Sequence, residues 1–276
     1  MLNAGGELLD LSTPLVMGIL NITPDSFFRG SRFGAYSEEL LQRAGEMLES
    51  GAAILDVGGY STRPGAEDIP ESEEKDRVLP VVEAILKAFP TAILSIDTFR
   101  SGVAREAARS GARMINDVSG GNLDEAMFET VAALKLPYVL MHMRGTPQTM
   151  TQLTTYSHLL NDVISELQTK LARLRSLGVA DVLIDPGFGF AKTVAQNFEL
   201  LRNLQYFHEL DAPLLIGLSR KSLIWRTLGV SAEEALNGTT VLNTLALTQG
   251  AHILRVHDVK EAVEAIKLYE FVARNG

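Results

Sequence analysis

The sequence contains no cysteine among its 276 residues. It therefore excludes disulfides, thiolate catalysis and cysteine-based zinc sites. It also lacks an apolar run approaching the roughly 20 residues that a membrane-spanning helix needs. Residues 1–7 show no basic region followed by an apolar stretch, as a signal peptide would. We therefore expect a cytoplasmic protein without a membrane partner.

Positive charge is also in short supply. The 25 Lys and Arg residues are outnumbered by 34 Asp and Glu residues, which gives a formal net charge of −9. Nucleic-acid-binding domains usually present a basic surface, so the balance argues against nucleic acid as a partner. If the substrate is an anion, the protein must gather its cations locally, against its overall field.

Short apolar runs alternate with longer helical patterns along the whole chain. Eight runs are rich in Val, Ile and Leu without polar alternation, which is typical of strands buried on both faces. They are 15–20, 53–57, 92–97, 113–116, 138–142, 181–185, 213–218 and 252–256. Eight strands, each followed by a helix, predict a single-domain α/β protein with a (β/α)₈ TIM barrel. We expect the barrel proper at about 15–274, with the first dozen residues capping its bottom.

Two structural questions stay open in the sequence. A doubly wound open sheet is the alternative fold, but it usually carries a Gly-rich fingerprint after its first strand, and residues 21–25 have none. The helical pattern at 72–89 contains Pro80, which removes a helix hydrogen bond and clashes with the preceding turn. A kink, or a second helix that begins at Pro80, would resolve the conflict.

Polar or glycine-rich sequence follows every predicted strand. In a barrel the active site is built at the C-terminal ends of the strands, so these clusters would converge on one mouth. Any one Asp, Asn or His at such a place is more often a turn or cap residue. A buried set of them is costly unless a ligand or mutual pairing satisfies it. The set is Asp97, Asn116, Asp185, Lys221 and Arg255.

The chemistry of this set suits a flat heterocycle with a phosphorylated arm. Asp185 could accept two hydrogen bonds from adjacent ring N–H groups, and Asn116 can donate and accept at once. Arg255 could stack its planar guanidinium on a ring face. The helix that opens at 219–222 could hold an anion with its free backbone N–H groups. The local cations that a diphosphate would need are Arg63, Lys221, Arg255 and His257.

Eight segments, in this order, resemble the dihydropteroate synthase family. They are 21–27 (NITPDSF), 58–65 (GGYSTRPG), 96–98 (IDT), 115–121 (INDVSGG), 141–143 (MHM), 185–190 (DPGFGF), 219–222 (SRKS) and 255–258 (RVHD). Single pieces are weak signals, but the set of eight is highly specific. The resemblance implies a homodimeric, Mg²⁺-dependent enzyme. Its reaction would join 6-hydroxymethyl-7,8-dihydropterin pyrophosphate to p-aminobenzoate, giving 7,8-dihydropteroate and pyrophosphate.

The resemblance also implies roles for individual side chains. The pterin ring would be bound by Asp97, Asn116, Asp185, Lys221 and Arg255. The pyrophosphate would be surrounded by Asn21, Arg63, Arg255 and His257, and Asn21 would give its side-chain oxygen to Mg²⁺. The p-aminobenzoate pocket would be lined by Thr62, Pro64, Phe190, Lys221 and Ser222. Catalysis would fall to Asp97, Lys221, Arg255 and Asp25, the last carried by a loop that closes over the site.

Two loops depart from the family pattern. After Phe27 the family commonly has a small or polar residue and then Asp-Gly-Gly, whereas this chain has Phe28, Arg29, Gly30, Ser31 and Arg32. Tyr60 stands where the family usually has Glu. The strand-end residues are intact, so we expect the same reaction, with any effect falling on loop closure and on aminobenzoate affinity.

Three other functions compete with this interpretation. Lys221 could be the Schiff-base lysine of an aldolase. A folate-dependent methyltransferase barrel would share the pterin-binding acid and amide, but has no obvious need for Arg63, Lys221 and His257. A paralogue that binds pterin but has lost catalysis is the strongest of the three, because of the altered loops.

Overall fold

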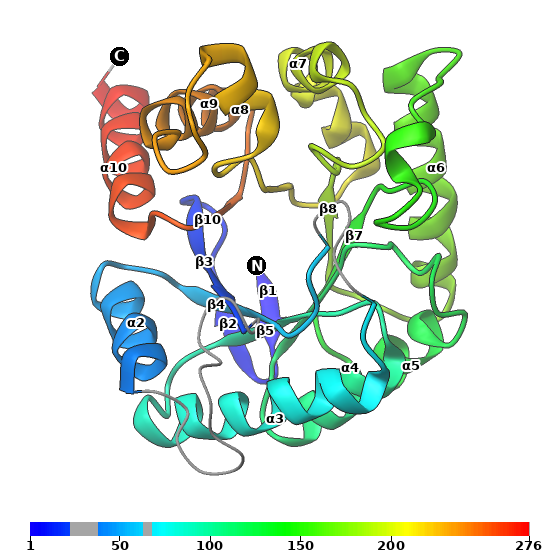
Figure 1. Cartoon of the computed structure of the whole chain (residues 1–276), viewed down its shortest axis with the longest axis vertical. Coiled ribbons are helices and arrows are strands. Elements are labelled where there is room, and N and C mark those ends of the chain that lie inside the picture. Colours follow the sequence, from blue (N-terminus) through cyan, green and yellow to red (C-terminus); the bar gives the residue numbers. More distant parts are fainter. Residues whose placement is uncertain (23–37, 63–67, 276) are drawn as a thin grey trace.

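Eight parallel strands surrounded by helices make up the computed structural model, which describes residues 1–22, 38–62 and 68–275 (Figure 1). The strands are β3 (Leu15–Asn21), β4 (Ile54–Gly58), β5 (Leu94–Asp97), β6 (Met114–Asp117), β7 (Tyr138–Met141), β8 (Val182–Asp185), β9 (Leu215–Ile216) and β10 (Ile253–Val256). Each of the eight predicted strands is present, and the observed bounds lie within about three residues of the predicted ones.

The strands form a nearly closed barrel. They are hydrogen-bonded in the order β8-β7-β6-β5-β4-β3-β10-β9, all in parallel. Between the two end strands of this order, β8 and β9, a single parallel bridge joins Ile184 to Leu214, and the Ile184 N–H donates to the Pro213 carbonyl at 2.8 Å. The barrel prediction is confirmed, and the open sheet is excluded.

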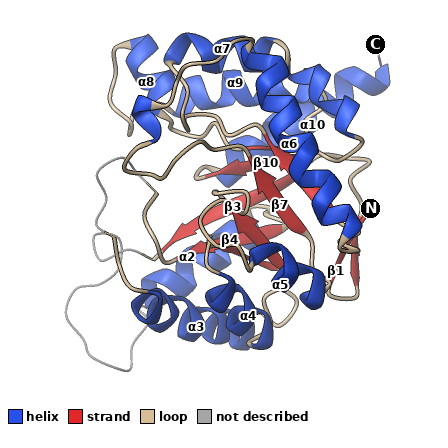
Figure 2. Cartoon of the chain, turned by 90° about the vertical axis from the view of Figure 1, so that its right-hand side faces the viewer, coloured by secondary structure: helices blue, strands red, loops and turns tan. Residues whose placement is uncertain are grey.

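Helices cover the outside of the barrel in the described part of the chain (Figures 1 and 2). They are α2 (Glu38–Glu49), α3 (Glu71–Ala88), α4 (Ser101–Arg109), α5 (Met127–Leu134), α6 (Leu159–Ser176), α7 (Val194–Arg202), α8 (Ser222–Leu228), α9 (Leu236–Thr248) and α10 (Val259–Asn275). Helix α6 shows why they form, because it buries an apolar residue every three or four positions. Those residues are Leu159, Val163, Leu167, Leu171 and Leu174.

Helix α3 runs without interruption through Pro80. Of the two alternatives that the sequence left open, a second helix beginning at Pro80 is therefore excluded. Val78, Val81 and Val82 are fully buried on either side of it. Burying a Val side chain contributes about 1.5–3 kcal/mol, so this packing offsets the hydrogen bond that the proline removes.

The N-terminal residues close one end of the barrel, as predicted. Strands β1 (Leu2–Ala4) and β2 (Glu7–Leu9) form an antiparallel hairpin that lies inside the ring of helices when the barrel is viewed end on (Figure 1). Leu2 and Ala4 are buried in one apolar cluster with Met17 and Ile54, at the starts of the barrel strands. The opposite end, where the strands finish, is left for the site.

A search of the described residues for a helix long and apolar enough to cross a membrane found none.

Candidate active site

Four barrel strands end with buried polar side chains. Asp97 and Asp185 are the last residues of β5 and β8, and Asn116 is the last but one of β6; they are only 8%, 4% and 2% exposed. Arg255 lies in β10 with 17% of its side chain exposed. The structure thus brings together residues that are up to 158 positions apart in sequence, as the barrel prediction required.

A third carboxylate, Asp56, completes this cluster and was missed by sequence reasoning. It is fully buried in β4. Its Oδ2 accepts hydrogen bonds from Arg255 Nε at 2.6 Å and from Asn116 Nδ2 at 2.9 Å. The signal that could have found it is a lone acid between apolar residues of a strand buried on both faces, since an isolated charge there is costly.

Arg255 joins two of the acids. Besides its contact with Asp56, its Nη2 donates to Asp97 Oδ2 at 2.6 Å. The pairing fixes the plane of the guanidinium, because its donors form a rigid fork. It also means that the positive charge of Arg255 is balanced by two carboxylates, whereas the sequence had counted it among the free cations for a diphosphate.

Asp185 and Lys221 face the same space on the other side of the mouth. Asp185 Oδ1 accepts from the Gly187 N–H at 2.7 Å. Lys221 Nζ donates to the Phe188 carbonyl. A Cβ added to Gly217 would lie 3.7 Å from Lys221 Nζ and 3.9 Å from Asp185 Oδ2. Glycine at this position therefore keeps open the space between the acid and the ammonium.

The mouth holds more acid than base among the described residues. The acidic side chains are those of Asp56, Asp97 and Asp185, and the basic ones are those of Lys221 and Arg255. Burial, together with the nearby charge of Asp56, raises the pKa of Asp97 to about 7, although Arg255 opposes the rise. Burial also raises the pKa of Asp185. It lowers the pKa of Lys221 to about 8, with Asp185 acting against the change. Both Asp97 and Lys221 therefore titrate near neutral pH.

His257 lies beside this cluster but is not a cation. Burial, reinforced by the charge of Arg255, lowers the pKa of His257 to about 4. Ser219 Oγ lies 3.0 Å from His257 Nδ1 and accepts from the backbone N–H of His257 at 3.1 Å. With the ring proton on Nε2, the serine hydroxyl donates to Nδ1; with the proton on Nδ1, the ring donates to the serine. The sequence had counted His257 among the cations for a diphosphate, whereas the lowered pKa makes it neutral at pH 7 in the free protein. Its place around the pyrophosphate stays a prediction, in which a ring N–H would donate to the anion.

Asn21 is placed where a small cation could be held against a substrate. Its Oδ1 and Asp97 Oδ2 lie 3.6 and 3.7 Å from a Cβ built on Gly58, so both oxygens face one point at the mouth. No group of three His, Asp or Glu residues with metal-binding geometry occurs among the described residues. Mg²⁺ usually takes one or two protein oxygens and completes its shell with water and substrate phosphates. The side chains present fit that kind of site.

Phe190 and Lys221 adjoin each other in the predicted p-aminobenzoate region. Lys221 Nζ lies 4.9 Å from the centre of the Phe190 ring. Ser222 follows directly as the first residue of α8, and Thr62 is half-buried at the end of the described segment after β4. Asp25, Arg63 and Pro64 lie outside the described residues, as does the atypical segment 28–32.

Tyr60, the other departure from the family pattern, packs into an apolar cluster. It is 6% exposed, and its ring makes an edge contact with Phe99 at 4.9 Å between centroids. Its hydroxyl donates to Asp68 Oδ1 at 3.1 Å. Tyr60 therefore anchors its loop by packing, and it adds no charge to the mouth.

Comparison with known proteins identifies the family. The family model described as pterin binding enzyme matches residues 17–257. The dihydropteroate synthase of Escherichia coli strain K12 is 45% identical over 97% of this chain and 94% of its own length. This chain belongs to the dihydropteroate synthase family.

Solved structures of the family superpose closely on the chain. The Yersinia pestis dihydropteroate synthase with a sulfonamide drug complex has a TM-score of 0.91 and 44% identity, and it covers 100% of this chain and 99% of its own. The Xanthomonas albilineans dihydropteroate synthase in complex with 7,8-dihydropteroate has a TM-score of 0.87 and 36% identity, covering 99% and 98%. Membership over the full length disfavours the aldolase and methyltransferase alternatives.

Proposed function

We propose that the protein condenses 6-hydroxymethyl-7,8-dihydropterin pyrophosphate with p-aminobenzoate, releasing pyrophosphate and 7,8-dihydropteroate. One observation carries the proposal: the strand ends gather acids, an amide, a lysine and an arginine at a single mouth, in a chain similar to dihydropteroate synthases over nearly its whole length. Incubation with both substrates and Mg²⁺, followed by mass spectrometry, should detect dihydropteroate. Tight binding of the pterin substrate without this product would favour the catalytically silent paralogue.

The charges of the mouth suit a pterin ring. The ring offers adjacent N–H donors, and Asp185 Oδ2, which accepts no hydrogen bond from the described residues, can accept them; Oδ1 is bonded to Gly187. Asn116 has its amide N–H₂ tied to Asp56, so its carbonyl oxygen is turned to the role of acceptor. The guanidinium of Arg255, fixed by Asp56 and Asp97, would lie against a ring face.

The bond to pyrophosphate would break before the new bond forms. Departure of pyrophosphate leaves a methylene cation that the electron-rich pterin ring can delocalise. The amine of p-aminobenzoate is a weak base and is already neutral at pH 7, so no strong general base is required. Asp97, and Asp25 from the loop, would offset the developing positive charge, and Arg63 and a ring N–H of His257 would bind the leaving group. Mg²⁺ held at Asn21 would neutralise charge on the phosphates.

Release of pyrophosphate should therefore not require p-aminobenzoate, although it should be slower without it. Enzyme mixed with the pterin pyrophosphate and Mg²⁺, but without p-aminobenzoate, should release pyrophosphate slowly as water captures the cation. A coupled phosphate assay over several hours would measure it, with heat-denatured enzyme as the control. Complete dependence of release on p-aminobenzoate would argue for concerted displacement instead.

Activity should show a bell-shaped dependence on pH. The pKa of Asp97 is raised to about 7, so below that pH the acid is protonated and cannot offset a cation. The pKa of Lys221 is lowered to about 8, so above that pH the ammonium is lost. We expect kcat/KM for the pterin substrate to fall about tenfold per pH unit on each side of the 7–8 window. In Asp97→Asn the acidic limb should disappear. A profile that stays flat from pH 5.5 to 9 would contradict these assignments.

The protein should be a homodimer in the cytoplasm, as the resemblance implied. Support for the dimer comes from α9 and α10, which pack side by side and expose several large apolar side chains. On α10, Leu268, Phe271 and Val272 are 71%, 69% and 70% exposed. Exposed apolar residues of this size in one patch mark interaction surfaces.

Charges on that patch should separate the subunits. Phe271→Glu combined with Val272→Glu should change the molar mass in light scattering from that of two chains to that of one. Lys87→Glu, on an exposed position of α3, is the matched charge control and should leave the mass unchanged. A dimer that survives the double substitution would place the interface elsewhere.

A further inference from the structure

A buried ammonium lies behind the mouth, in a place that the proposed reaction does not use. Lys192 is 8% exposed. Its Nζ lies 3.0 Å from each of three acceptors, which are His142 Nδ1, the Gly187 carbonyl and the Phe190 carbonyl. In the ammonium form all three N–H donors of Lys192 are engaged. Burial lowers the pKa of Lys192 to about 7, with Asp185 acting against the change. In the described residues no carboxylate lies within ion-pair distance of Lys192.

The ring of His142 lies between Lys192 and Glu166 and contacts both. It is 2% exposed, and its Nε2 lies 3.0 Å from Glu166 Oε2. When Lys192 carries its positive charge it can only donate, so Nδ1 of His142 accepts and Nε2 carries the ring proton. Burial lowers the pKa of His142 to about 4, which is consistent with a neutral ring.

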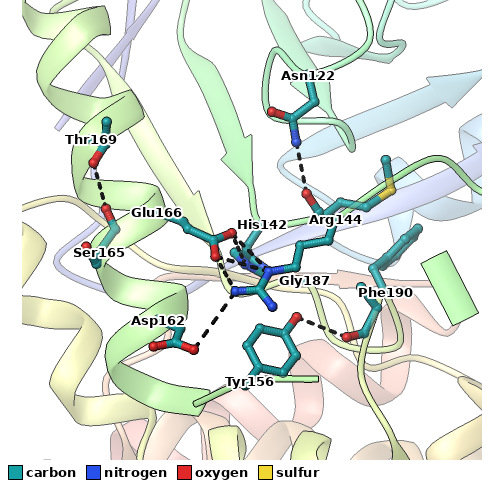
Figure 3. A network of polar contacts seen from close by, with 12 residues as sticks. Asn122, His142, Arg144, Tyr156, Asp162, Ser165, Glu166, Thr169, Gly187 and Phe190 are labelled. Carbon is teal, nitrogen blue, oxygen red and sulfur yellow. Dashed lines mark hydrogen bonds and ion pairs between the residues drawn. The ribbon is translucent and has the colours of Figure 1, made fainter. Parts of the chain in front are cut away.

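Lys192, His142, Glu166 and Arg144 form a network of hydrogen bonds, and Arg144 is its outermost member. Figure 3 shows the guanidinium of Arg144 between Glu166 and the Tyr156 ring. Its Nε donates to Glu166 Oε1 at 3.0 Å, and its guanidinium carbon lies 4.0 Å from the centre of the Tyr156 ring. Tyr156 in turn donates its hydroxyl to the Ala191 carbonyl at 3.0 Å. Both branches of the network therefore end on the segment 187–191.

The backbone of segment 187–191 is in a strained conformation that depends on contacts with its surroundings. Gly187, Gly189 and Ala191 have φ values of 72°, 82° and 50°. The left-handed conformation is strained for alanine and persists only where the surroundings enforce it. A Cβ on Gly187 would lie 2.0 Å from the carbonyl oxygen of His142, so the segment also packs closely against the residue that follows β7.

The segment carries two groups of the p-aminobenzoate region. The Phe188 carbonyl accepts from Lys221 Nζ, and the Phe190 ring lies 4.9 Å from the same atom. Lys192 bonds to the carbonyls of Gly187 and Phe190, on either side of Phe188. The position of the ammonium thus sets where Lys221 and the Phe190 ring stand relative to each other.

We propose that Lys192 is a positioning residue for the p-aminobenzoate half of the site, held in place by His142, Glu166 and Arg144. The inference rests on the proposed function for the identity of the second substrate. Lys192 itself would not contact the substrate, because it acts through Phe190 and Lys221.

The test separates the two substrates. Lys192→Met keeps the unbranched side chain as far as Cε but removes the amine and its donors. We expect its KM for p-aminobenzoate to rise at least tenfold. The Kd for dihydropterin pyrophosphate, measured by calorimetry without the amine, should rise several times less, because the Phe190 ring belongs to the p-aminobenzoate half alone whereas Lys221 serves both halves. Tyr138→Phe is the control, because it deletes a buried hydroxyl that donates to Asp117 at 2.7 Å and should change stability alone.

Two substitutions at His142 dissect the network and remain usable if Lys192→Met does not fold. His142→Asn puts an amide where Nδ1 stands and keeps an acceptor for Lys192, whereas His142→Gln puts it where Nε2 stands and keeps only the bond to Glu166. We expect KM for p-aminobenzoate within threefold of the parent for Asn and raised about tenfold for Gln. Equal values for the two variants would overturn the inference.

Failure of this inference can be told apart from failure of the proposed function. A parent protein that makes dihydropteroate, combined with a Lys192→Met variant of unchanged KM, refutes the inference alone. A parent that makes no dihydropteroate refutes the function. Even then, a crystal structure of Lys192→Met decides the positioning role: a displaced Phe190 supports it, and an unmoved segment 187–191 rejects it.

Discussion

Lys221→Ala should lower kcat by two to three orders of magnitude while the protein stays folded. Lys221 is the one ammonium found next to Asp185 at the mouth among the described residues, and it also bonds to the Phe188 carbonyl. Removing one preorganised donor of this kind costs about 3–4 kcal/mol of transition-state stabilisation. Steady-state rates and the melting temperature would be measured on the same preparation.

A lysine outside the mouth provides the control for this substitution. Lys75 on α3 pairs with Glu71 at 2.8 Å and with Glu106 at 2.7 Å, with part of its side chain exposed. Lys75→Ala should leave the rate unchanged, because such a pair contributes about 0–1 kcal/mol to stability and nothing to the site. If Lys221→Ala kept a rate within threefold of the parent, Lys221 would have no part in the reaction.

Arg255→Met should destabilise the fold by about 3–5 kcal/mol, because it leaves buried carboxylates without their cation. Asp56 is fully buried and shares one oxygen between Arg255 and Asn116. Asp97, 8% exposed, loses the same partner. Guanidinium denaturation would measure the loss, and calorimetry should show that pterin binding is lost with it.

Two further variants test the cause of that loss. Arg113→Met removes an arginine whose partner, Glu7, is half exposed, and it should cost less than about 1 kcal/mol. Asp56→Asn added to Arg255→Met should restore part of the lost stability, since an amide is far cheaper to bury than a carboxylate. An Arg255→Met protein as stable as the parent would mean that Asp56 and Asp97 are not held as charges.

The barrel and much of its site could be predicted from the sequence. Strands buried on both faces leave unbroken apolar runs, and the fold rule that strand ends converge then places Asp97, Asn116, Asp185 and Arg255 together. Bounds at β9 were less accurate, because that strand has only the two residues Leu215–Ile216.

What the sequence could not give were distances across the barrel. Asp56 and Arg255 are 199 positions apart, and only the folded chain shows that they pair. The neutral state of His257 follows from its burial beside Arg255, which no local pattern encodes. Lys192 reads as an ordinary charged residue before a helix, and its burial depends on the turns of the segment 187–191.

A crystal structure with dihydropterin pyrophosphate would show whether the side chains at the mouth surround one pterin ring. We expect one pterin ring with Asp185 and Asn116 at hydrogen-bond distance from its edge, Lys221 close to it and the Arg255 guanidinium parallel to its face. A ring bound in another cavity, with these four side chains arranged as in the free protein, would contradict it.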